Sequence, residues 1–421
     1  MKVLYICRVF TGLETSLLAG KWAPTGVPTI YKVMEALARP PHDSRFLLAT
    51  RGIGRDYATA WNTSQDKCVE LEGFPKPLHV LAGESRFPVW LGRLRGILTS
   101  LRHLFWIWWH FRTFAPDIVY VDRAHALIGA ILARFFGAKV VLRVMGVYPS
   151  MWDTLSGRGV VAQLERWAFK APFAMALCTQ DGSGGEFWMD KALAPATPRR
   201  MMLNGVDLLA PAPTRPPLPI PEGRTVVLFI GRLEWNKGCE PFVEALLSLP
   251  DDYATRIHGV IIGTGSQRDK LLRRIEATGA QERFTFIDRL PHAQIRDAHR
   301  QADIYVSLNR LGQLSNANLE VISGGNCFVA LDAQLDRKID VGTWNLIPPG
   351  AAVRIPIERE VPALAQVIME LSDAPERRRE MAGQIRAAAA GFIPSWSDRI
   401  AAELSLLETI ATGGKVPTTA P

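Results

Sequence analysis

The stretch "VSLNRLGQLSNANLEVISGGNCFVALD", residues 306–332, follows the order strand, loop, helix and strand. Its two ends are apolar runs, which are typical of strands buried on both faces of a sheet. Ser315 and Asn316 favour helix N-caps, and the pair Gly324–Gly325 is a common helix stop. We therefore predict a helix that begins near Ser315 or Asn316, ends at the glycine pair and connects two parallel strands.

The same alternation of short apolar runs and helical stretches extends over the whole chain. Helices are predicted for "PTIYKVMEALAR" and "PFVEALLSL". Such alternation predicts an α/β fold built from parallel sheets with crossover helices. The strand candidates are "KVLYI", "RFLLAT", "DIVYV", "KVVLRV", "AMALCT", "TVVLFIG", "GVIIG", "FTFID", "DIYVSL" and "CFVALD".

One proline-rich stretch, "LLAPAPTRPPLPIPEG", interrupts this alternation. Proline continues neither a helix nor a strand ladder, so we expect a stiff connector between two Rossmann-like domains facing across a cleft. Ligands of such sheets bind at the carboxyl ends of the strands, and we expect one in that cleft. The predicted parts are an N-terminal domain 1–207, a linker 208–223, a C-terminal domain 224–393, a closing helix 394–412 and a disordered tail 413–421.

Composition limits the class of partner. The chain has 421 residues, is 48% hydrophobic and carries a formal net charge of +8. This charge favours phosphates, nucleotides, anionic lipid surfaces or nucleic acid. Nucleic acid is disfavoured because the basic residues are dispersed and no recognition motif is present. No apolar run reaches the length of a membrane span, and "MKVLYICRVF" is typical of a first strand rather than a signal peptide, so we expect a cytoplasmic protein.

The cysteines predict neither a zinc site nor a disulfide framework. They are far apart and odd in number, and none forms a CxxC pair. We expect buried free thiols, as in a reducing compartment. The five are Cys7, Cys68, Cys178, Cys239 and Cys327.

The stretch "FIGRLEWNKG" places two cations after a buried strand. The strand ends at Gly231, Arg232 follows directly, and Lys237 precedes a predicted helix. An arginine at this edge can bind a diphosphate through two hydrogen bonds, and a lysine can add a point charge. The alternative is a charged loop that is merely solvated.

Glu320 lies one turn inside the helix predicted after Ser315. The free amides and the dipole at the start of that helix suit a phosphate. The Glu320 carboxylate is then placed to accept hydrogen bonds from a ribose or sugar hydroxyl. The alternative for a lone glutamate on a helix is an ordinary surface residue.

Taken together, these motifs resemble those of the retaining glycosyltransferases of family four, also called the group-one glycosyl transferases, which have the two-domain GT-B architecture. "GRLEWNKG" matches that family's G-R-L-x-x-x-K-G, and "LSNANLEVISGGNCFVA" is similar to its L-S-N-A-x-L-E-A-M-A-x-G-x-P-V-V. "LNGVDLL", "ADIYVSL" and "SWSDRIAAELSLLE" resemble its N-G-V-D element, its A-D-x-x-V-x-P-S strand and its closing helix, which crosses back to the N-terminal domain.

The resemblance implies a nucleotide-sugar donor held by the C-terminal domain, without a metal ion. Arg232 and Lys237 would bind its diphosphate and Glu320 its ribose. Backbone groups around Ser315 would bind the phosphates, and residues after the strand "FTFID" would contact the base. The further donor-binding candidates are Gly231, Gly263, Gly265, Arg289, Leu290, Leu314 and Asn316.

The N-terminal domain would hold the acceptor. Its first loop, "RVFTGLETSLLAGKWAPTG", is longer than in the family and is expected to contact the acceptor; Gly26 ends it as a close-approach glycine. Pro28 suits the first turn of the next helix. Met145 precedes Gly146 where a family histidine often lies, and His125 is either a cleft residue or an ordinary core histidine.

Gly312 stands where the family carries the first of two acids spaced by seven residues; Glu320 is the second. This departure leaves three accounts open. Another group replaces the acid, or the donor sugar needs no carboxylate there, or the protein binds nucleotide or a partner without turnover. The candidate replacements are Asn309, Arg310, Gln313 and Asp181.

Residues 93–114, "RLRGILTSLRHLFWIWWHFRTF", have an unusual aromatic and basic composition. Helical spacing predicts one buried stripe, with Trp106 and Trp109 outside it and Trp106 near Arg95 and Arg102. This suits either a peripheral membrane contact or a core helix with snorkelling arginines. The residues of the predicted stripe are Leu94, Ile97, Leu98, Leu101, Phe105 and Trp108.

The sequence thus predicts an enzyme that transfers a sugar from a nucleotide-diphosphate donor to a glycan or lipid-linked acceptor, in bacterial surface polysaccharide or glycolipid synthesis, at the inner face of the membrane. The alternatives are a weak or inactive nucleotide-sugar-binding subunit and a nucleotide-sugar epimerase of the same architecture.

Overall fold

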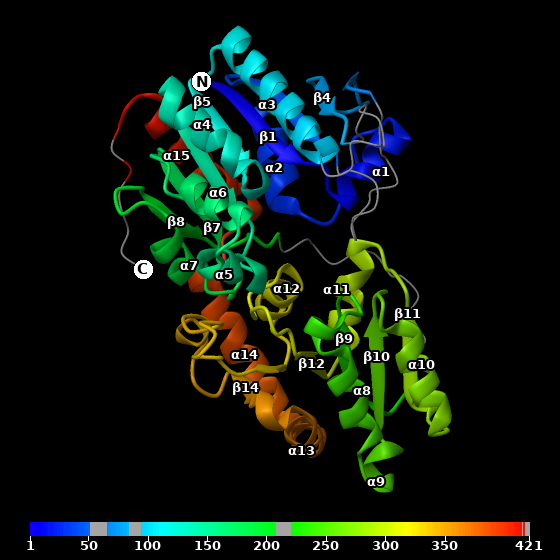
Figure 1. The fold of residues 1–421 in the computed structure, drawn as a ribbon. Helices are drawn as coiled ribbons and strands as arrows, with labels where there is room; N and C mark the ends of the chain where they lie inside the picture. Colours follow the sequence, from blue (N-terminus) through cyan, green and yellow to red (C-terminus); the bar gives the residue numbers. More distant parts are fainter. Residues whose placement is uncertain (51–64, 84–93, 208–219, 415, 417–421) are drawn as a thin grey trace. The chain divides into compact units, whose positions relative to one another are not determined.

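The structure is a computed structural model, and it describes residues 1–50, 65–83, 94–207, 220–414 and 416 (Figure 1). Most of the predicted linker and of the predicted tail therefore lies outside the described residues.

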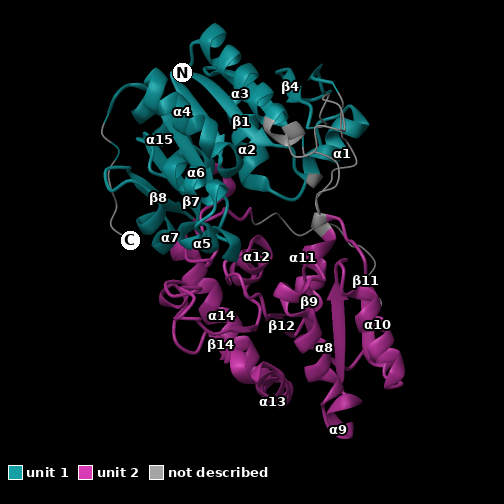
Figure 2. Cartoon of the chain, viewed as in Figure 1, with its two compact units in different colours: residues 1–179, 186–202, 399–421 teal, residues 180–185, 203–398 magenta. Residues whose placement is uncertain are grey.

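The chain forms two compact units (Figure 2). Unit 1 comprises residues 1–179, 186–202 and 399–421, and unit 2 comprises residues 180–185 and 203–398. Two changes of unit occur along the chain apart from the predicted linker. The short loop 180–185 belongs to unit 2 although the residues on both sides of it belong to unit 1, and the closing helix returns to unit 1 from Arg399 onward.

Within the described residues, unit 1 contains an eight-stranded sheet in the order β3-β4-β2-β1-β5-β6-β7-β8. β3 pairs with β4 in antiparallel orientation, and the other neighbouring strands are parallel. The strands are β1 (Lys2–Arg8), β2 (Asp43–Ala49), β3 (Lys67–Val69), β4 (Leu78–Leu81), β5 (Ile118–Asp122), β6 (Val140–Val144), β7 (Met175–Thr179) and β8 (Arg199–Met202).

Helices cover both faces of this sheet. Helices α3 to α7 share a core with Leu4 and Ile6 of β1. Side chains alternate between faces along a strand, so Tyr120 of β5 points to the opposite face, where its hydroxyl donates to Glu403 of α15. The helices are α1 (Thr11–Ala19), α2 (Pro28–Leu37), α3 (Leu94–Phe114), η2 (Arg123–His125), α4 (Ala126–Phe136), α5 (Pro149–Ser156), α6 (Val160–Phe169), α7 (Gly185–Ala192) and α15 (Trp396–Ala411).

Unit 2 contains a parallel sheet whose six described strands have the order β11-β10-β9-β12-β13-β14. The strand order reverses between β9 and β12, and such a switch point opens a crevice at the carboxyl ends of the two strands. The strands are β9 (Thr225–Ile230), β10 (Ile257–Ile262), β11 (Phe284–Ile287), β12 (Ile304–Ser307), β13 (Phe328–Leu331) and β14 (Ala352–Ile355).

Two helical layers cover the unit 2 sheet. Helices α8, α10 and α13 share a core with Val227 and Phe229 of β9, and α11, α12 and α14 share a core with Val226 and Leu228. The elements are η3 (Trp235–Lys237), α8 (Cys239–Leu247), α9 (Asp251–Ala254), α10 (Arg268–Ala277), η4 (Gln281–Arg283), α11 (His292–Gln301), α12 (Asn316–Gly324), η5 (Thr343–Asn345), η6 (Ile357–Arg359), α13 (Glu360–Asp373) and α14 (Pro375–Phe392).

The element predictions can be compared directly with these bounds. All ten predicted strands are confirmed, as are the two predicted helices, now α2 and α8, and the closing helix α15. Ser315 is the N-cap of α12, and Gly325 ends it in a left-handed conformation, as predicted. The sequence did not reveal the short strands β3, β4, β8 and β14.

The prediction of a long first loop was wrong, because residues 11–19 form helix α1. Leu13 and Leu17 lie one turn apart and are both buried, and Gly20 stops the helix in a left-handed conformation. The cysteine prediction was wrong at one position. All five cysteines are free, but Cys68 is exposed while the other four are buried.

Helix α3 forms as predicted, but its predicted buried stripe is only partly right: Trp108 packs against the core. Ile107 and Phe114 are buried, whereas Leu101 and Phe105 of the predicted stripe are each 54% exposed. Arg93 and the side chains of residues 94–97 lie outside the described residues. Apolar side chains occur on several faces of this helix, so the sequence pattern did not determine which face packs on the sheet.

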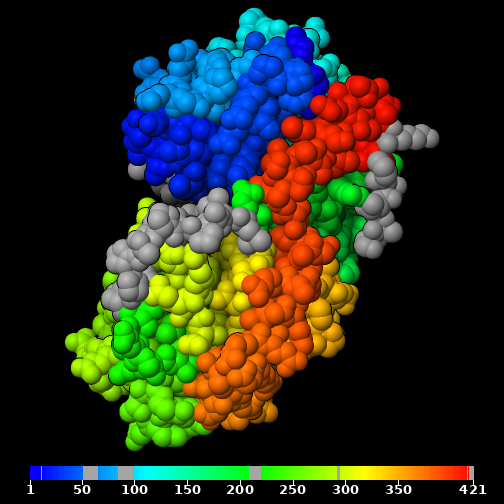
Figure 3. Space-filling view, turned by 180° about the vertical axis from the view of Figure 1, so that it is seen from behind, coloured from blue at the N-terminus to red at the C-terminus, as the bar shows by residue number. Residues whose placement is uncertain are grey.

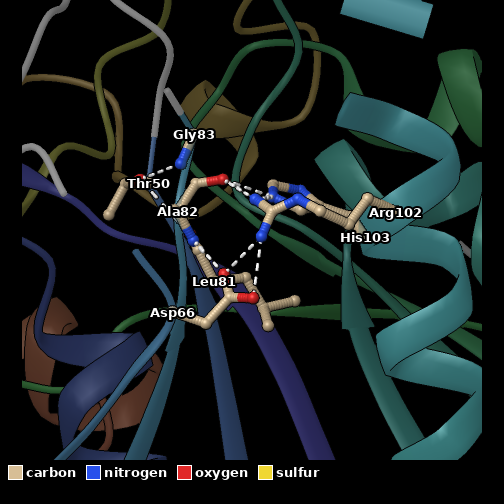
Figure 4. A network of polar contacts seen from close by, with 7 residues as sticks. All are labelled: Thr50, Asp66, Leu81, Ala82, Gly83, Arg102 and His103. Carbon is tan, nitrogen blue, oxygen red and sulfur yellow. Dashed lines mark hydrogen bonds and ion pairs between the residues drawn. The ribbon is translucent and has the colours of Figure 1, made fainter. Parts of the chain in front are cut away.

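Arg102 of α3 is turned toward the sheet rather than toward the outer aromatic residues (Figure 4). Its guanidinium donates to both carboxylate oxygens of Asp66 at 2.7 Å and to the carbonyl of Ala82, which follows β4. His103 Nε2 lies 2.7 Å from the same carbonyl. These contacts fix α3 against the end of β4.

Candidate functional site

Two loops meet at the switch point of unit 2: the β9 loop, residues 231–238, and the β12 loop, residues 308–315. The amide of Arg310 donates to the carbonyl of Asn236 at 2.9 Å. Gly238 has a positive φ of 73°, and a Cβ there would lie 2.3 Å from the Cβ of Leu308. This glycine is therefore required for the two loops to approach each other.

Two cations lie in the β9 loop beside this contact. Arg232 is exposed, and Lys237 is half-buried at the end of η3. Burial and the neighbouring Arg232 lower the pKa of Lys237, and the Asp181 carboxylate opposes this shift. The site thus combines two positive charges at the carboxyl end of a parallel strand with a carboxylate from another loop.

The loop after β10 also packs against the β9 loop. A Cβ on Gly263 would lie 1.9 Å from the Gly231 carbonyl oxygen, and one on Gly265 would lie 2.4 Å from that of Leu233. Ser266 donates to Glu234 through both its amide and its hydroxyl. The close approach at both glycines is therefore between two loops of the chain itself.

The start of α12 is fixed by contacts within unit 2. The hydroxyl of Ser315 accepts from the amide of Asn318 as an N-cap, and Asn316 Oδ1 accepts from Asn204 at 2.7 Å. Leu314 is buried in a small core, and its amide donates to the Asp181 carbonyl. The Asn318 amide is thus capped, and the amides of Asn316 and Ala317 ahead of it point out of the helix, where an anion can bind.

Glu320 is half-buried on α12 and lines a cavity of about 540 Å³. The cavity is lined by residues of α11, α12 and α14, including Arg296, Arg378 and Arg379. Figure 3 shows the side where the yellow segment that contains α12 lies beside the orange helix α14. The described lining of this cavity does not include Arg232 or Lys237.

Residues 180–185 bring Asp181 to the β12 loop. The Asp181 carbonyl accepts from Leu314, and the Gly182 carbonyl accepts from the amide of Asp340 at 2.7 Å. Burial raises the pKa of Asp181 to about 6, although hydrogen bonds from Ser183 and the charge of Lys237 oppose the shift. A carboxyl group with this pKa titrates close to neutral pH.

The sequence analysis did not select Asp340, which is buried and organises the same loop. Its Oδ1 accepts from the amide of Gln313 at 2.8 Å and from the Thr343 hydroxyl at 2.7 Å. No motif points to this residue, because its partner in the β12 loop is 27 positions away in the chain.

The other candidates lie elsewhere. Arg289 and Leu290 follow β11, where Arg289 is exposed and Leu290 packs against the core. In unit 1, Gly26 precedes α2 and Gly146 follows β6. His125 lies in η2, with Nδ1 2.6 Å from Oδ1 of Asp122, whose Oδ2 accepts from the Arg8 amide at the end of β1. Asp122 thus orients His125.

The structure therefore brings Arg232 and Lys237 together with the Gly312–Leu314 loop and Asp181, all in unit 2. Glu320 lies on the same helix that follows this loop but lines the α11–α14 cavity. His125, Gly26 and Gly146 belong to the other unit. Among the residues that the structure describes, no group of three or more His, Cys, Asp and Glu side chains is arranged to hold a metal ion.

Residues 212–386 match the family model of glycosyl transferases, group 1. This segment contains the β9 loop, the β12 loop and α12. Two curated relatives are each 28% identical to the chain. One is a 2-deoxystreptamine N-acetyl-D-glucosaminyltransferase of Streptomyces fradiae, over 51% of this chain and 54% of the relative. The other is an alpha-D-kanosaminyltransferase of Streptomyces kanamyceticus, over 38% and 40%. The chain spans about half the length of the curated relatives it matches.

Solved structures show the same fold over nearly the whole chain. Sucrose-phosphate synthase from Thermosynechococcus elongatus has a TM-score of 0.69 at 14% identity, with 98% of this chain and 100% of that chain covered. The Anabaena protein HepE in complex with UDP has a TM-score of 0.65 at 14% identity, with 97% and 100% covered. The chain has the GT-B architecture, with two Rossmann-like α/β units.

Proposed function

We propose that the protein is a glycosyltransferase that moves a sugar from a nucleoside diphosphate to a hydroxyl group of an acceptor. The observation that carries this proposal is the pair Arg232 and Lys237 at the switch point of unit 2, within the segment that matches the glycosyl transferase model. In the reaction, the bond between the anomeric carbon and the diphosphate oxygen breaks, a bond to the acceptor oxygen forms, and the hydroxyl proton is released.

The chemistry at the leaving group follows from these charges. The diphosphate gains negative charge as the anomeric bond breaks, and preorganised cations stabilise such charge in a site shielded from water. Arg232 can form two parallel hydrogen bonds to phosphate oxygens, and Lys237 supplies a second charge. The amides at the start of α12 add further donors. This set supports the expectation that no metal ion is needed.

The donor and acceptor are proposed by analogy. HepE has been solved in complex with UDP-glucose, and the Streptomyces fradiae relative is an N-acetyl-D-glucosaminyltransferase, so a UDP-hexose is the first donor to test. We further propose a glycan or lipid-linked acceptor, a role in bacterial surface polysaccharide or glycolipid synthesis, and retention of the anomeric configuration.

An exposed aromatic face in unit 1 supports a lipid-linked acceptor at the cytoplasmic side of a membrane. Leu101, Phe105, Trp106 and Trp109 of α3 are between 37% and 54% exposed. Tryptophan and phenylalanine on an outer helix face suit the interfacial region of a bilayer, and a net charge of +8 suits anionic headgroups. None of the described helices is both long and apolar enough to cross a membrane.

The proposal is tested by incubating the protein with UDP-, GDP- and ADP-sugars and a bacterial membrane extract. Sugar recovered in an extractable product, with release of one nucleoside diphosphate, is the expected result. Absence of any released nucleoside diphosphate would contradict transfer and favour a binding subunit, for which Gly312 is the supporting observation. Isomerisation of the nucleotide sugar without transfer would instead indicate an epimerase.

A further inference from the structure

Position 312 has no room for a side chain. Gly312 has a φ of 119°, and a Cβ there would lie 2.2 Å from the Asp181 carbonyl oxygen and 2.7 Å from the carbonyl carbon of Gly182. These neighbours are backbone atoms, which cannot move aside as the end of a flexible side chain could. The space beside the β12 loop is thus taken by the loop 180–185.

Asn309 and Gln313, two of the candidate replacements for the acid, hold the β12 loop in shape. Asn309 donates to the Gly312 carbonyl and accepts from the Leu311 amide. Gln313 is fully buried, donates to the Asn309 carbonyl and packs with Asn318. Both side chains are used within the loop, so neither is available to contact a substrate.

Arg310, the third candidate, forms an ion pair with Glu360 at the start of α13. Both side chains are largely shielded from solvent, with exposed fractions of 19% and 14%. Arg310 also carries the wrong charge to replace a carboxylate as a hydrogen-bond acceptor.

Asp181, the fourth candidate, supplies a carboxylate from the loop whose backbone lies where a side chain at position 312 would be. Its Oδ1 accepts from the amide of Ser183 at 3.0 Å and from the Ser183 hydroxyl at 2.5 Å. Within the described part of the chain, these hydrogen bonds leave Oδ2 without a donor. Asp181 lies close enough to Lys237 for the two charges to influence each other.

This location bears on the donor sugar. If Lys237 binds the diphosphate, the sugar attached to that diphosphate lies within a few ångström of the same ammonium group. Asp181, whose charge influences that of Lys237, is then a candidate partner for the sugar's hydroxyl groups, because an ionised carboxylate is the strongest acceptor that a side chain can offer to a hydroxyl.

We propose that Asp181 is the sugar-binding carboxylate of this site and accepts a hydrogen bond from one hydroxyl group of the transferred sugar through Oδ2. The proposal rests on the proposed function. It replaces the acid that the motif places at position 312 with one from a loop 131 positions earlier in the chain. Glycine at 312 thus makes space for the loop that carries the replacing carboxylate.

The test compares Asp181→Asn with the unaltered protein and with Asp252→Asn, a matched control on the exposed face of α9. Binding of UDP, GDP and ADP is measured by calorimetry, and sugar release or transfer is measured with UDP-glucose, UDP-N-acetylglucosamine, GDP-mannose and ADP-glucose. We expect nucleoside diphosphate affinity to change less than about threefold in Asp181→Asn, while turnover falls about 10- to 100-fold, as for the loss of a charged hydrogen bond. Asp252→Asn should change neither.

A set of monodeoxy analogues of the accepted donor then identifies the hydroxyl. One analogue should react at least about 10-fold more slowly with the unaltered protein, and this penalty should vanish in Asp181→Asn, because the partner carboxylate is gone. If turnover of Asp181→Asn stays within threefold of the unaltered protein, or every analogue keeps its penalty, the sugar-binding role is wrong although the protein remains a transferase. If the unaltered protein binds no nucleoside diphosphate and releases no sugar, the proposed function itself fails.

A second variant keeps the proposal testable if Asp181→Asn does not fold, as judged by thermal unfolding. Ser183→Ala retains the carboxylate and removes a hydroxyl that lowers its pKa. The acidic limb of the turnover profile should therefore move to higher pH. An unmoved limb would contradict contact between Asp181 and the reacting sugar.

Discussion

At the scale of single residues, Gly312 meets two conditions that exclude a side chain: a positive φ and backbone atoms where a Cβ would lie. An alanine there combines a positive φ with a Cβ 2.2 Å from a backbone oxygen. We expect Gly312→Ala to lower the free energy of unfolding by about 2–4 kcal/mol, from backbone strain and overpacking together. Chemical denaturation measures this. The matched control is Gly342→Ala, because Gly342 has a negative φ and no atom within 4 Å of a Cβ; equal losses in both variants would refute the steric account.

This geometry also changes what a glutamate at position 312 can reveal. If position 312 had simply lost an acid that nothing replaces, Gly312→Glu would restore it and raise turnover. The structure predicts the opposite, because the side chain would displace residues 181–183 and with them the Asp181 carboxylate. We expect turnover to fall in this variant, in the same transfer assay, whereas a gain would show that Asp181 does not replace the acid.

The ionisation of Asp181 gives a pH dependence with a definite sign. Burial raises the pKa to about 6, so the carboxylate form, which accepts the sugar hydroxyl, is lost as the pH falls through 6. Lys237 and Ser183 face this group, and Asp340 holds the neighbouring Gly182. Turnover of the unaltered protein should therefore fall about tenfold per pH unit below 6. A pH–rate profile that is flat from pH 5 to 7 would contradict this.

At the scale of elements, helix α15 is joined to unit 1 by a buried ionic network. Glu403 is fully buried, lies 2.6 Å from Arg399 and accepts from Tyr120. Burial alone would raise the pKa of Glu403, but Arg143, Arg399 and Tyr120 hold it below its usual value. The stability gained from this ionised carboxylate is present above the pKa of glutamate in the unfolded chain and is lost as the pH falls through the lower folded pKa.

Removal of the Glu403 carboxylate should therefore be costly. Glu403→Ala removes the ion-pair partner of the buried Arg399 and the negative charge that compensates the buried Arg143, and we expect the free energy of unfolding to fall by about 3–5 kcal/mol. Glu408→Ala, on the same helix with a side chain 56% exposed, should change it by no more than about 1 kcal/mol. Thermal or urea unfolding distinguishes the two, and similar values for both would contradict the network's role.

The outer face of α3 predicts a lipid interaction. Trp106→Ala combined with Trp109→Ala should weaken binding to phosphatidylglycerol vesicles about tenfold or more, because each indole contributes buried apolar area at the interface. Thr113→Ala on the same helix is the control. Vesicle flotation measures the binding; failure of the unaltered protein to bind such vesicles would remove the membrane face from the account.

The sequence predicted regular elements well where local pattern alone determines them. Continuous apolar runs such as Val226–Ile230 indicate strands buried on both faces, whatever their neighbours. The apolar pattern did not predict the structure where it is compatible with more than one arrangement. In α3, aromatic residues occupy adjacent faces, so the buried face depends on contacts such as that between Arg102 and Asp66. In β3 and β14, few residues are buried, so the apolar signal is weak.

At the scale of the whole molecule, sequence reasoning found the motifs but not the segments that assemble with them. The resemblance drew attention to Arg232 and Lys237, which lie in the loop after β9, and this loop contacts the loop after β12 at the switch point. The loop 180–185 lies between β7 and α7 of unit 1 but counts with unit 2. No local pattern predicts this, since the contact between Asp181 and Leu314 joins distant parts of the chain.

The central claim is that unit 2 binds a nucleoside diphosphate through Arg232 and Lys237. Calorimetric titration of the full chain with UDP, GDP and ADP tests it most directly, alongside Arg232→Ala, Lys237→Ala and Arg273→Ala, an exposed cation on α10 as control. We predict that one of the three nucleotides binds, that each site variant weakens it about tenfold or more, and that Arg273→Ala leaves it unchanged. Binding that is equally strong in all four proteins, or absent from the unaltered chain, would contradict the claim.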